Sequence, residues 1–165
     1  MPDRKLHLTP FSWIALLSLA FLGGCYESSA PLGPAEQAVV NPEFLGTWTC
    51  RGAGKDEGAA TLLVVAFDSS RYYLEYRDKE ETTRWAAHPS VVGGVLLHNV
   101  RELKDDSRAT KWVFLRALTP TASTLLLSLV KDDDLKKLSE PDAHREIRRR
   151  VNDESLYKPW RTCTR

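Results

Sequence analysis

Residues 60–77 read ATLLVVAFDSSRYYLEYR, and this stretch decides the fold. It begins with an apolar run rich in β-branched residues, which is typical of a buried strand. Residues 68–70 (Asp-Ser-Ser) supply turn chemistry, and after them the side chains alternate, with Tyr72, Leu74 and Tyr76 on one face. Two strands joined by so short a turn pair in antiparallel fashion. The stretch therefore predicts a β-hairpin.

The same two-residue period extends on both sides of this hairpin. It predicts further strands at residues 47–50, 82–92, 95–100, 111–118, 124–130 and 156–164. Between two of them, Gly93-Gly94 is a hairpin signal because glycine adopts positive φ freely. The fold class that follows is mainly β: an antiparallel up-and-down meander or small barrel of seven to eight strands.

One α-helix is predicted near the C-terminus, at about residues 139–152. Ser139 is a helix cap and Pro141 lies in the first turn. Ala143, Ile147 and Val151 then recur at a spacing of four residues. This spacing gives the helix one narrow apolar stripe for packing.

The composition fits one globular domain, which we expect at residues 43–165. The chain has 165 residues, of which 42% are hydrophobic and 27% are charged, unlike a disordered chain. Lys and Arg number 23 against 22 Asp and Glu, a net charge of +1. Nucleic acid is not an expected partner, because its binding depends on a surplus of basic residues.

The N-terminal residues differ from the rest of the chain. Arg4 and Lys5 precede an uncharged apolar run at residues 11–22. As a helix this run would span about 18 Å, less than the roughly 30 Å of a bilayer's hydrocarbon core. A basic start, a short apolar run and small residues together predict a signal peptide at residues 1–24. The alternative interpretation is a buried N-terminal helix.

Leu22-Gly23-Gly24-Cys25 closes this segment and resembles the lipobox of bacterial lipoprotein precursors. The resemblance implies that the Cys25 thiol receives diacylglycerol, that the peptide is cut before Cys25, and that the new amino group is acylated, for example with palmitate. No other cofactor is expected. Tyr26, in place of Asp, implies sorting to the outer membrane where the envelope has two membranes. Ordinary secretion, with Cys25 free or disulfide-bonded, is the alternative.

Residues 25–42 are small, polar and proline-containing, with no period. This composition predicts a flexible tether between the anchor and the domain. Removal of residues 1–24 takes out two basic residues and one acidic residue and leaves a net charge of zero. The acyl groups on Cys25, rather than charge, would therefore hold the protein on membrane lipid.

Gly46-Thr47-Trp48 resembles the Gly-x-Trp of the first strand of lipocalin-like barrels. In that family a helix follows the strands and an arginine near the C-terminus packs on the tryptophan, which here implies Arg161 against Trp48. The Thr-Asp-Tyr motif of the family is absent from this sequence. The resemblance implies a small apolar ligand among five aromatic side chains: Trp48, Tyr72, Tyr76, Trp85 and Trp112. The alternative interpretation of Trp48 is a core residue of any β-sheet.

Once Cys25 is lipidated, Cys50 and Cys163 remain as an even pair. They lie in the first and last predicted strands, which are neighbours in an up-and-down barrel. An exported protein meets conditions that permit disulfides. We therefore predict a Cys50–Cys163 disulfide, with two reduced thiols as the alternative.

The sequence contains no motif typical of catalysis or metal binding that we can assign. His88, His98 and His144 lack the spacing of zinc ligands, and neither H-E-x-x-H, C-x-x-C nor G-x-S-x-G occurs. We therefore expect no enzyme and no metal. The function expected is that of a lipid-anchored envelope protein that binds a protein partner or envelope component; the alternative is a lipocalin-like carrier of a small apolar ligand.

Overall fold

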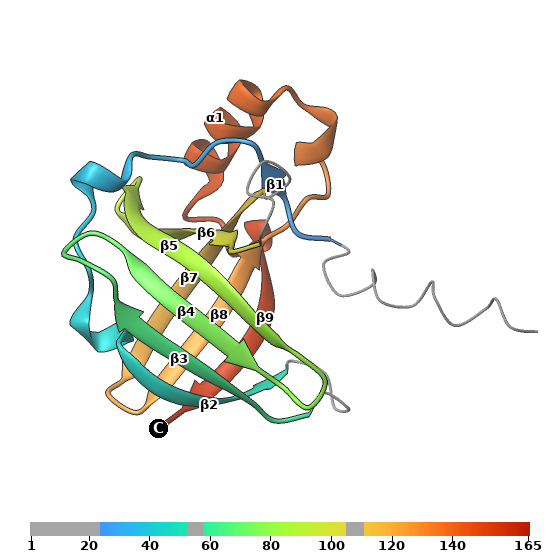
Figure 1. Cartoon of the computed structure of the whole chain (residues 1–165). Helices are drawn as coiled ribbons and strands as arrows, with labels where there is room; N and C mark the ends of the chain where they lie inside the picture. The colour runs from blue at the N-terminus through green and yellow to red at the C-terminus, as the bar shows by residue number, and fades with distance from the viewer. Residues whose placement is uncertain (1–23, 53–57, 105–110) are drawn as a thin grey trace, which may run out of the picture.

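The computed structural model describes residues 24–52, 58–104 and 111–165 (Figure 1). Residues 1–23 of the predicted signal peptide, including Leu22 and Gly23, lie outside the described residues, whereas Gly24 lies within them. The described chain forms one nine-stranded antiparallel sheet with a single α-helix.

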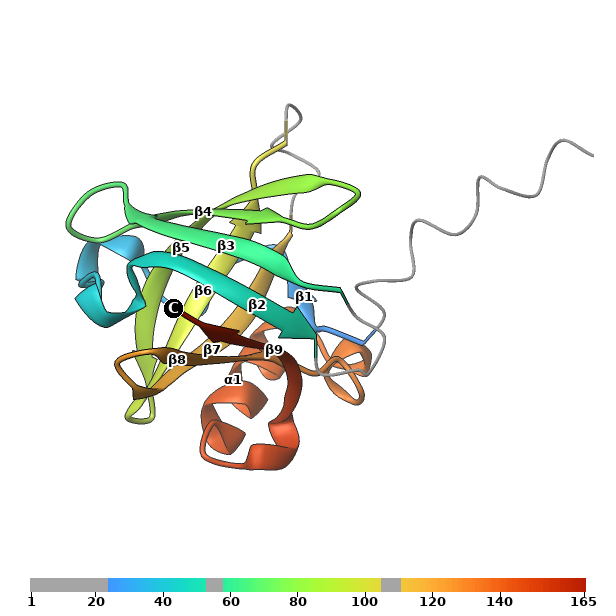
Figure 2. The same ribbon diagram turned by 90° about the horizontal axis from the view of Figure 1, so that it is seen from below.

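Eight of the strands close into a barrel, because β9 pairs with β2 on one side and with β8 on the other (Figures 1 and 2). These strands are β2 (Gly46–Gly52), β3 (Ala60–Ala66), β4 (Tyr72–Arg77), β5 (Thr82–Val92), β6 (Val95–Glu102), β7 (Trp112–Thr121), β8 (Thr124–Val130) and β9 (Tyr157–Thr164). The short β1 (Glu27–Ser28) pairs with β7 outside the ring. The predicted fold class is confirmed.

The deciding hairpin forms as its sequence predicts. β3 and β4 pair in register from Thr61 opposite Arg77 to Ala66 opposite Tyr72. Along β4 the predicted face is buried, whereas Arg77 is exposed. The β5–β6 turn is made by Gly93 and Gly94, whose φ angles of 55° and 83° are those that glycine adopts without strain.

The predicted helix is α1 (Glu140–Arg150), and it packs on the outside of the barrel (Figure 2). The Ser139 hydroxyl accepts a hydrogen bond from the amide of Asp142 and so caps the helix. The apolar stripe of α1 is buried against outward-facing side chains of β6 and β7, in a cluster that includes Ala143, Ile147, Val151, Leu97 and Phe114. The described ranges also contain the short 3₁₀ helices η1 (Ala35–Gln37), η2 (Pro42–Phe44), η4 (Leu135–Lys137) and η5 (Glu154–Leu156).

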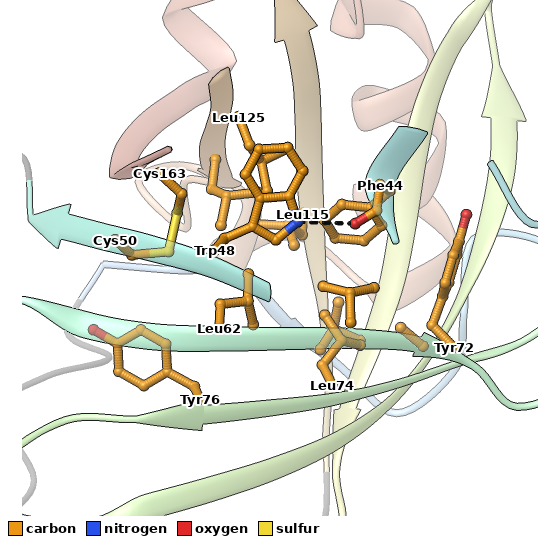
Figure 3. Close-up of a cluster of buried hydrophobic side chains, with 14 of the residues drawn as sticks. Phe44, Trp48, Cys50, Leu62, Tyr72, Leu74, Tyr76, Leu115, Leu125 and Cys163 are labelled. Carbon is orange, nitrogen blue, oxygen red and sulfur yellow. Dashed lines mark hydrogen bonds between the residues drawn. A yellow bond between two sulfur atoms is a disulfide. The ribbon is translucent and has the colours of Figure 1, made fainter. Parts of the chain in front are cut away.

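The predicted disulfide is confirmed. Cys50 and Cys163 lie opposite each other on β2 and β9, with their Cα atoms 3.9 Å apart and their sulfur atoms bonded. Both side chains are fully buried inside the barrel (Figure 3). The bridge therefore joins the two strands that close the sheet.

Residues 25–42 differ from the flexible tether that their composition predicts, because they lie against the barrel. Tyr26 and Leu32 are buried in the cluster beneath α1. The Leu32 amide donates to Asn99 Oδ1 at 2.7 Å, and His88 Nε2 lies 2.9 Å from the carbonyl oxygen of Gly33. These partners come from distant strands, so a reading of local composition misses them.

Candidate functional site

The barrel has two ends that the strand register distinguishes. On β2 and β9, Thr49 lies opposite Thr164, whereas Gly52 lies opposite Arg161. We call the first the Trp48 end, where Phe44, Trp48 and Arg165 meet. We call the second the Cys25 end, where Cys25, Tyr76 and Trp160 lie.

At the Trp48 end, the Trp48 ring is fully buried in the interior and has two polar contacts. Its Nε1 donates to the carbonyl oxygen of Phe44 at 3.1 Å (Figure 3). The Arg165 guanidinium lies 4.4 Å from the centre of the ring and donates to the carbonyl oxygens of Leu45 and Ala122. An arginine stacked on an aromatic face is stabilised by a cation–π interaction.

The arginine on Trp48 is therefore Arg165, and the expectation that Arg161 takes this place is wrong. Because β9 runs antiparallel to β2, Thr164 lies beside Thr49 and the following residue reaches Trp48. Arg161 lies at the Cys25 end instead, opposite Gly52.

Tyr72 lies near the Trp48 end in a ring cluster that excludes water. The Phe44 ring is 5.3 Å from Tyr72 and 4.7 Å from the imidazole of His98. His98 is 1% exposed, and within the described residues neither of its ring nitrogens has a hydrogen-bond partner. Burial lowers the pKa of His98 to about 4, so its imidazole is neutral at pH 7.

Tyr76 and Trp85 belong to a different cluster, at the Cys25 end. Tyr76 lies 6.0 Å from Trp85 and 5.6 Å from Trp160, and the two tryptophan rings are 6.2 Å apart in an edge-to-face arrangement. Arg161 Nε donates to the Tyr76 hydroxyl at 2.8 Å. Burial raises the pKa of Tyr76 to about 12, so the hydroxyl stays protonated.

Trp160 is a residue that the sequence analysis missed. The pairing of β8 with β9 shifts here, because Leu127 lies opposite Arg161 and Ser128 lies opposite Pro159. Trp160 is the extra residue of this β-bulge, and bulges redirect side chains. A pattern of strict alternation does not reveal this, although the Trp-Arg pair near the C-terminus was visible as a sequence feature.

Trp112 lies apart from the other four predicted ligand residues. Its side chain is on the outer wall of the barrel, 5.3 Å from the His88 ring, with the Arg101 guanidinium 5.0 Å from its centre. The five aromatic residues therefore do not form one site. They divide between the Trp48 end, the Cys25 end and the outer wall.

The interior is filled more completely at one end than at the other. Trp48, Val64 and Leu125 have no exposed surface, whereas Tyr76 retains 6% and Cys25 retains 8%. Trp85 and Trp160 are only partly buried. At the Cys25 end the interior aromatic rings therefore stay partly exposed, whereas Trp48 is fully covered at the other end.

Cys25 lies beside the end of β8, at the edge of the interior cluster. It bridges to Lys131 just beyond β8, and the amide of the following Tyr26 donates to the carbonyl oxygen of Val130 at 3.0 Å. Burial raises the pKa of the Cys25 thiol. Beside it is a surface groove of about 490 Å³, lined by Cys25, Tyr26, Ser29, Lys136, Leu138 and Glu140 among others.

An ordered hydrogen-bond network holds the chain next to this groove. Glu140, at the start of α1, accepts hydrogen bonds from the amide and hydroxyl of Ser29 and from the Ser28 hydroxyl. These bonds, led by the Ser29 hydroxyl, lower the pKa of Glu140 to about 2. Ser28 Oγ also lies 2.9 Å from Nε2 of His144. The Glu140 carboxylate therefore holds Ser28 and Ser29, three and four residues after Cys25, against the start of α1.

We compared the chain with models of protein families, with curated proteins and with solved structures. No model of a known protein family matches the chain, and neither a curated protein nor a solved structure matches it. Within the described residues, no three or more potential metal ligands gather into one group. None of the helices in the described ranges is long and apolar enough to cross a membrane.

Proposed function

We propose that the protein is a lipid-anchored binding module of the cell envelope, attached to membrane lipid through Cys25. The observation that carries the proposal is the place of Cys25. It follows directly after an apolar segment and two small residues, and it pairs with Lys131 at the end of β8. Two or three acyl chains hold a protein firmly on a bilayer, whereas one alone binds weakly.

The groove beside Cys25 supports this attachment. Cys25 is 8% exposed in the uncleaved chain, and it lines the groove together with Gly24, which cleavage removes. The groove of about 490 Å³ gives the linked group a route to the surface. Tyr26, rather than Asp, favours the outer membrane where the envelope has two membranes.

The work of the anchored barrel, in this proposal, is binding rather than catalysis. A barrel end packed around Trp48 supports a rigid scaffold with a surface for an envelope protein or another envelope component. Val39 and Phe67 are 76% and 69% exposed at the far end from Cys25. They are apolar side chains that a protein partner can cover.

Replacing Cys25 by serine tests the anchor. The Cys25→Ser protein should leave the membrane fraction, and the wild-type protein should carry acyl groups on an N-terminal Cys25 by mass spectrometry. Glu27→Gln, an exposed change close by, is the matched control and should stay with the membrane. An unprocessed Cys25→Ser protein that stays in the membrane would point to a signal anchor instead.

A lipocalin-like carrier is the second candidate, favoured by the partly buried rings of Trp85 and Trp160. The ligand surface in this version is the Cys25 end, because Trp48 and Tyr72 are at most 1% exposed. Organic extraction of the natively purified protein, followed by mass spectrometry, tests it. A stoichiometric apolar compound that Trp85→Ala removes would favour the carrier over the binding module.

A further inference from the structure

The position of Cys25 determines which part of the barrel faces the lipid, if the proposed anchor is granted. No free chain separates Cys25 from the sheet, since Cys25 lies opposite Lys131 and the amide of the next residue, Tyr26, donates to the carbonyl oxygen of Val130 at 3.0 Å. Acyl chains on Cys25 must lie in the hydrocarbon of the bilayer. The barrel end next to Cys25 is then held at the headgroups.

We propose that the Cys25 end is a membrane-docking surface whose Trp85 and Trp160 rings enter the interfacial layer of a phospholipid bilayer. The inference rests on the proposed lipid anchor. Tryptophan is enriched at this depth because its ring is apolar and its N–H is polar. Both rings are partly buried and 6.2 Å apart, and the bulge of β9 directs the Trp160 ring into the cluster that holds Trp85.

Other side chains at this end suit the same partner. Leu103 and Leu138 are 46% and 43% exposed. The Leu103 amide donates to the carbonyl oxygen of Arg84, beside Trp85, and Leu138 lines the groove with Cys25. Lys158 lies close enough to lower the pKa of the Cys25 thiol, although burial outweighs it. A lysine with a long aliphatic stem suits the headgroup level.

The Trp48 end carries the exposed apolar side chains Val39, Phe67 and Val91, but among the described residues it has neither the anchor cysteine nor a partly exposed tryptophan. Trp48 has no exposed surface and its ring is covered by Arg165. Phe67 is exposed there, with the Arg71 guanidinium 5.0 Å from its centre. The anchor directs this end away from the bilayer, so Phe67 marks a position that lipid should not reach.

Fluorescence quenching tests the proposal with the processed, membrane-purified protein. The protein is reconstituted into phosphatidylcholine vesicles whose acyl chains carry bromine, which quenches tryptophans that touch them. We expect quenching of the wild type and loss of most of it in the Trp85→Phe, Trp160→Phe double variant. In that background Phe67→Trp is the matched reporter of the far end, and its emission should stay unquenched.

Quenching that persists unchanged in the double variant, or that affects the tryptophan placed at position 67, overturns the docking surface. The N-terminal mass of the same sample separates the two proposals. Acylated Cys25 without quenching keeps the anchor and overturns the surface. Quenching that depends on Trp85 and Trp160 in a protein without acyl groups keeps the surface and overturns the anchor; absence of both overturns both.

Discussion

The Trp48 end and the Cys25 end of one barrel are built differently. At the first, the fully buried indole of Trp48 donates a hydrogen bond to the carbonyl oxygen of Phe44, and the Arg165 guanidinium covers its ring. At the second, three aromatic rings and Arg161 form a cluster that stays partly exposed. We therefore expect side chains that fill the interior around Trp48 to contribute more to stability than the partly exposed rings at the Cys25 end.

The largest effect expected is that of Trp48→Ala. Removing a fully buried indole leaves a cavity and costs about 3–5 kcal/mol of unfolding free energy. Trp160→Ala at the Cys25 end should cost markedly less, because its ring is only partly buried. Urea unfolding of both variants measures the difference. Equal losses of unfolding free energy in the two variants would show that both ends of the barrel contribute equally to stability, which would contradict the expected difference between them.

The disulfide comes next. Replacing both Cys50 and Cys163 by alanine opens a bridge between residues 113 apart in sequence. Such a loss costs about 2–4 kcal/mol. Cys25→Ala removes the cysteine that is not disulfide-bonded and should cost less, since it breaks no bridge. Thermal unfolding of the three proteins tests this, and a double variant as stable as the wild type would refute it.

The pH dependence of stability tests the filled end through His98. Its pKa is about 4 in the folded protein, below the ordinary 6.5, so between these values the unfolded chain binds a proton that the folded chain does not. Stability is therefore complete above pH 6.5 and falls as the pH drops toward 4, by at most about 3 kcal/mol.

The variant His98→Phe isolates this contribution, because a neutral ring of similar shape keeps the contacts with Phe44 and Tyr72. Unfolding measured between pH 4 and 7 should depend less on pH in the variant. Burial also lowers the pKa of His144, so some dependence of the same sign remains. Identical pH profiles for wild type and variant would contradict the assignment.

The smallest effect expected is that of Arg165→Met. The variant loses a cation–π contact and two hydrogen bonds to carbonyl oxygens, together about 1–2 kcal/mol. Arg71→Met is the control, because Arg71 is more than half exposed, and both its ion pair with Asp68 and its contact with the exposed Phe67 ring contribute less in water than a contact with a buried ring. Chemical unfolding of both variants gives the comparison. A larger loss for Arg71→Met would show that the ring of Trp48 does not depend on Arg165.

Much of the fold was predictable because its signals are local. The β3–β4 hairpin follows from alternation and a turn, and the Gly93-Gly94 turn follows from the freedom of glycine. The cap at Ser139 and the apolar stripe define α1 within a few residues. The pairing of Cys50 with Cys163 needed only the order of the strands.

The candidate site was less predictable, since alternation gives two faces and does not say which is the interior. Trp112 and Leu115 lie on opposite faces of β7. Leu115 faces the interior, and the outer face that carries Trp112 is also apolar, because α1 and residues 25–33 cover it. Trp160 enters the aromatic cluster through a bulge, which breaks the alternation that sequence reasoning relies on.

The sequence by itself determined the strands, the late helix and the cysteines available for a bridge, because these depend on periodicity and residue type. Only the tertiary structure decided which arginine covers Trp48, because that depends on the register of β9 against β2. It also decided that residues 25–42 lie on the barrel. Their hydrogen bonds go to Asn99, Glu140 and other distant residues, and such contacts exist only once the chain has folded.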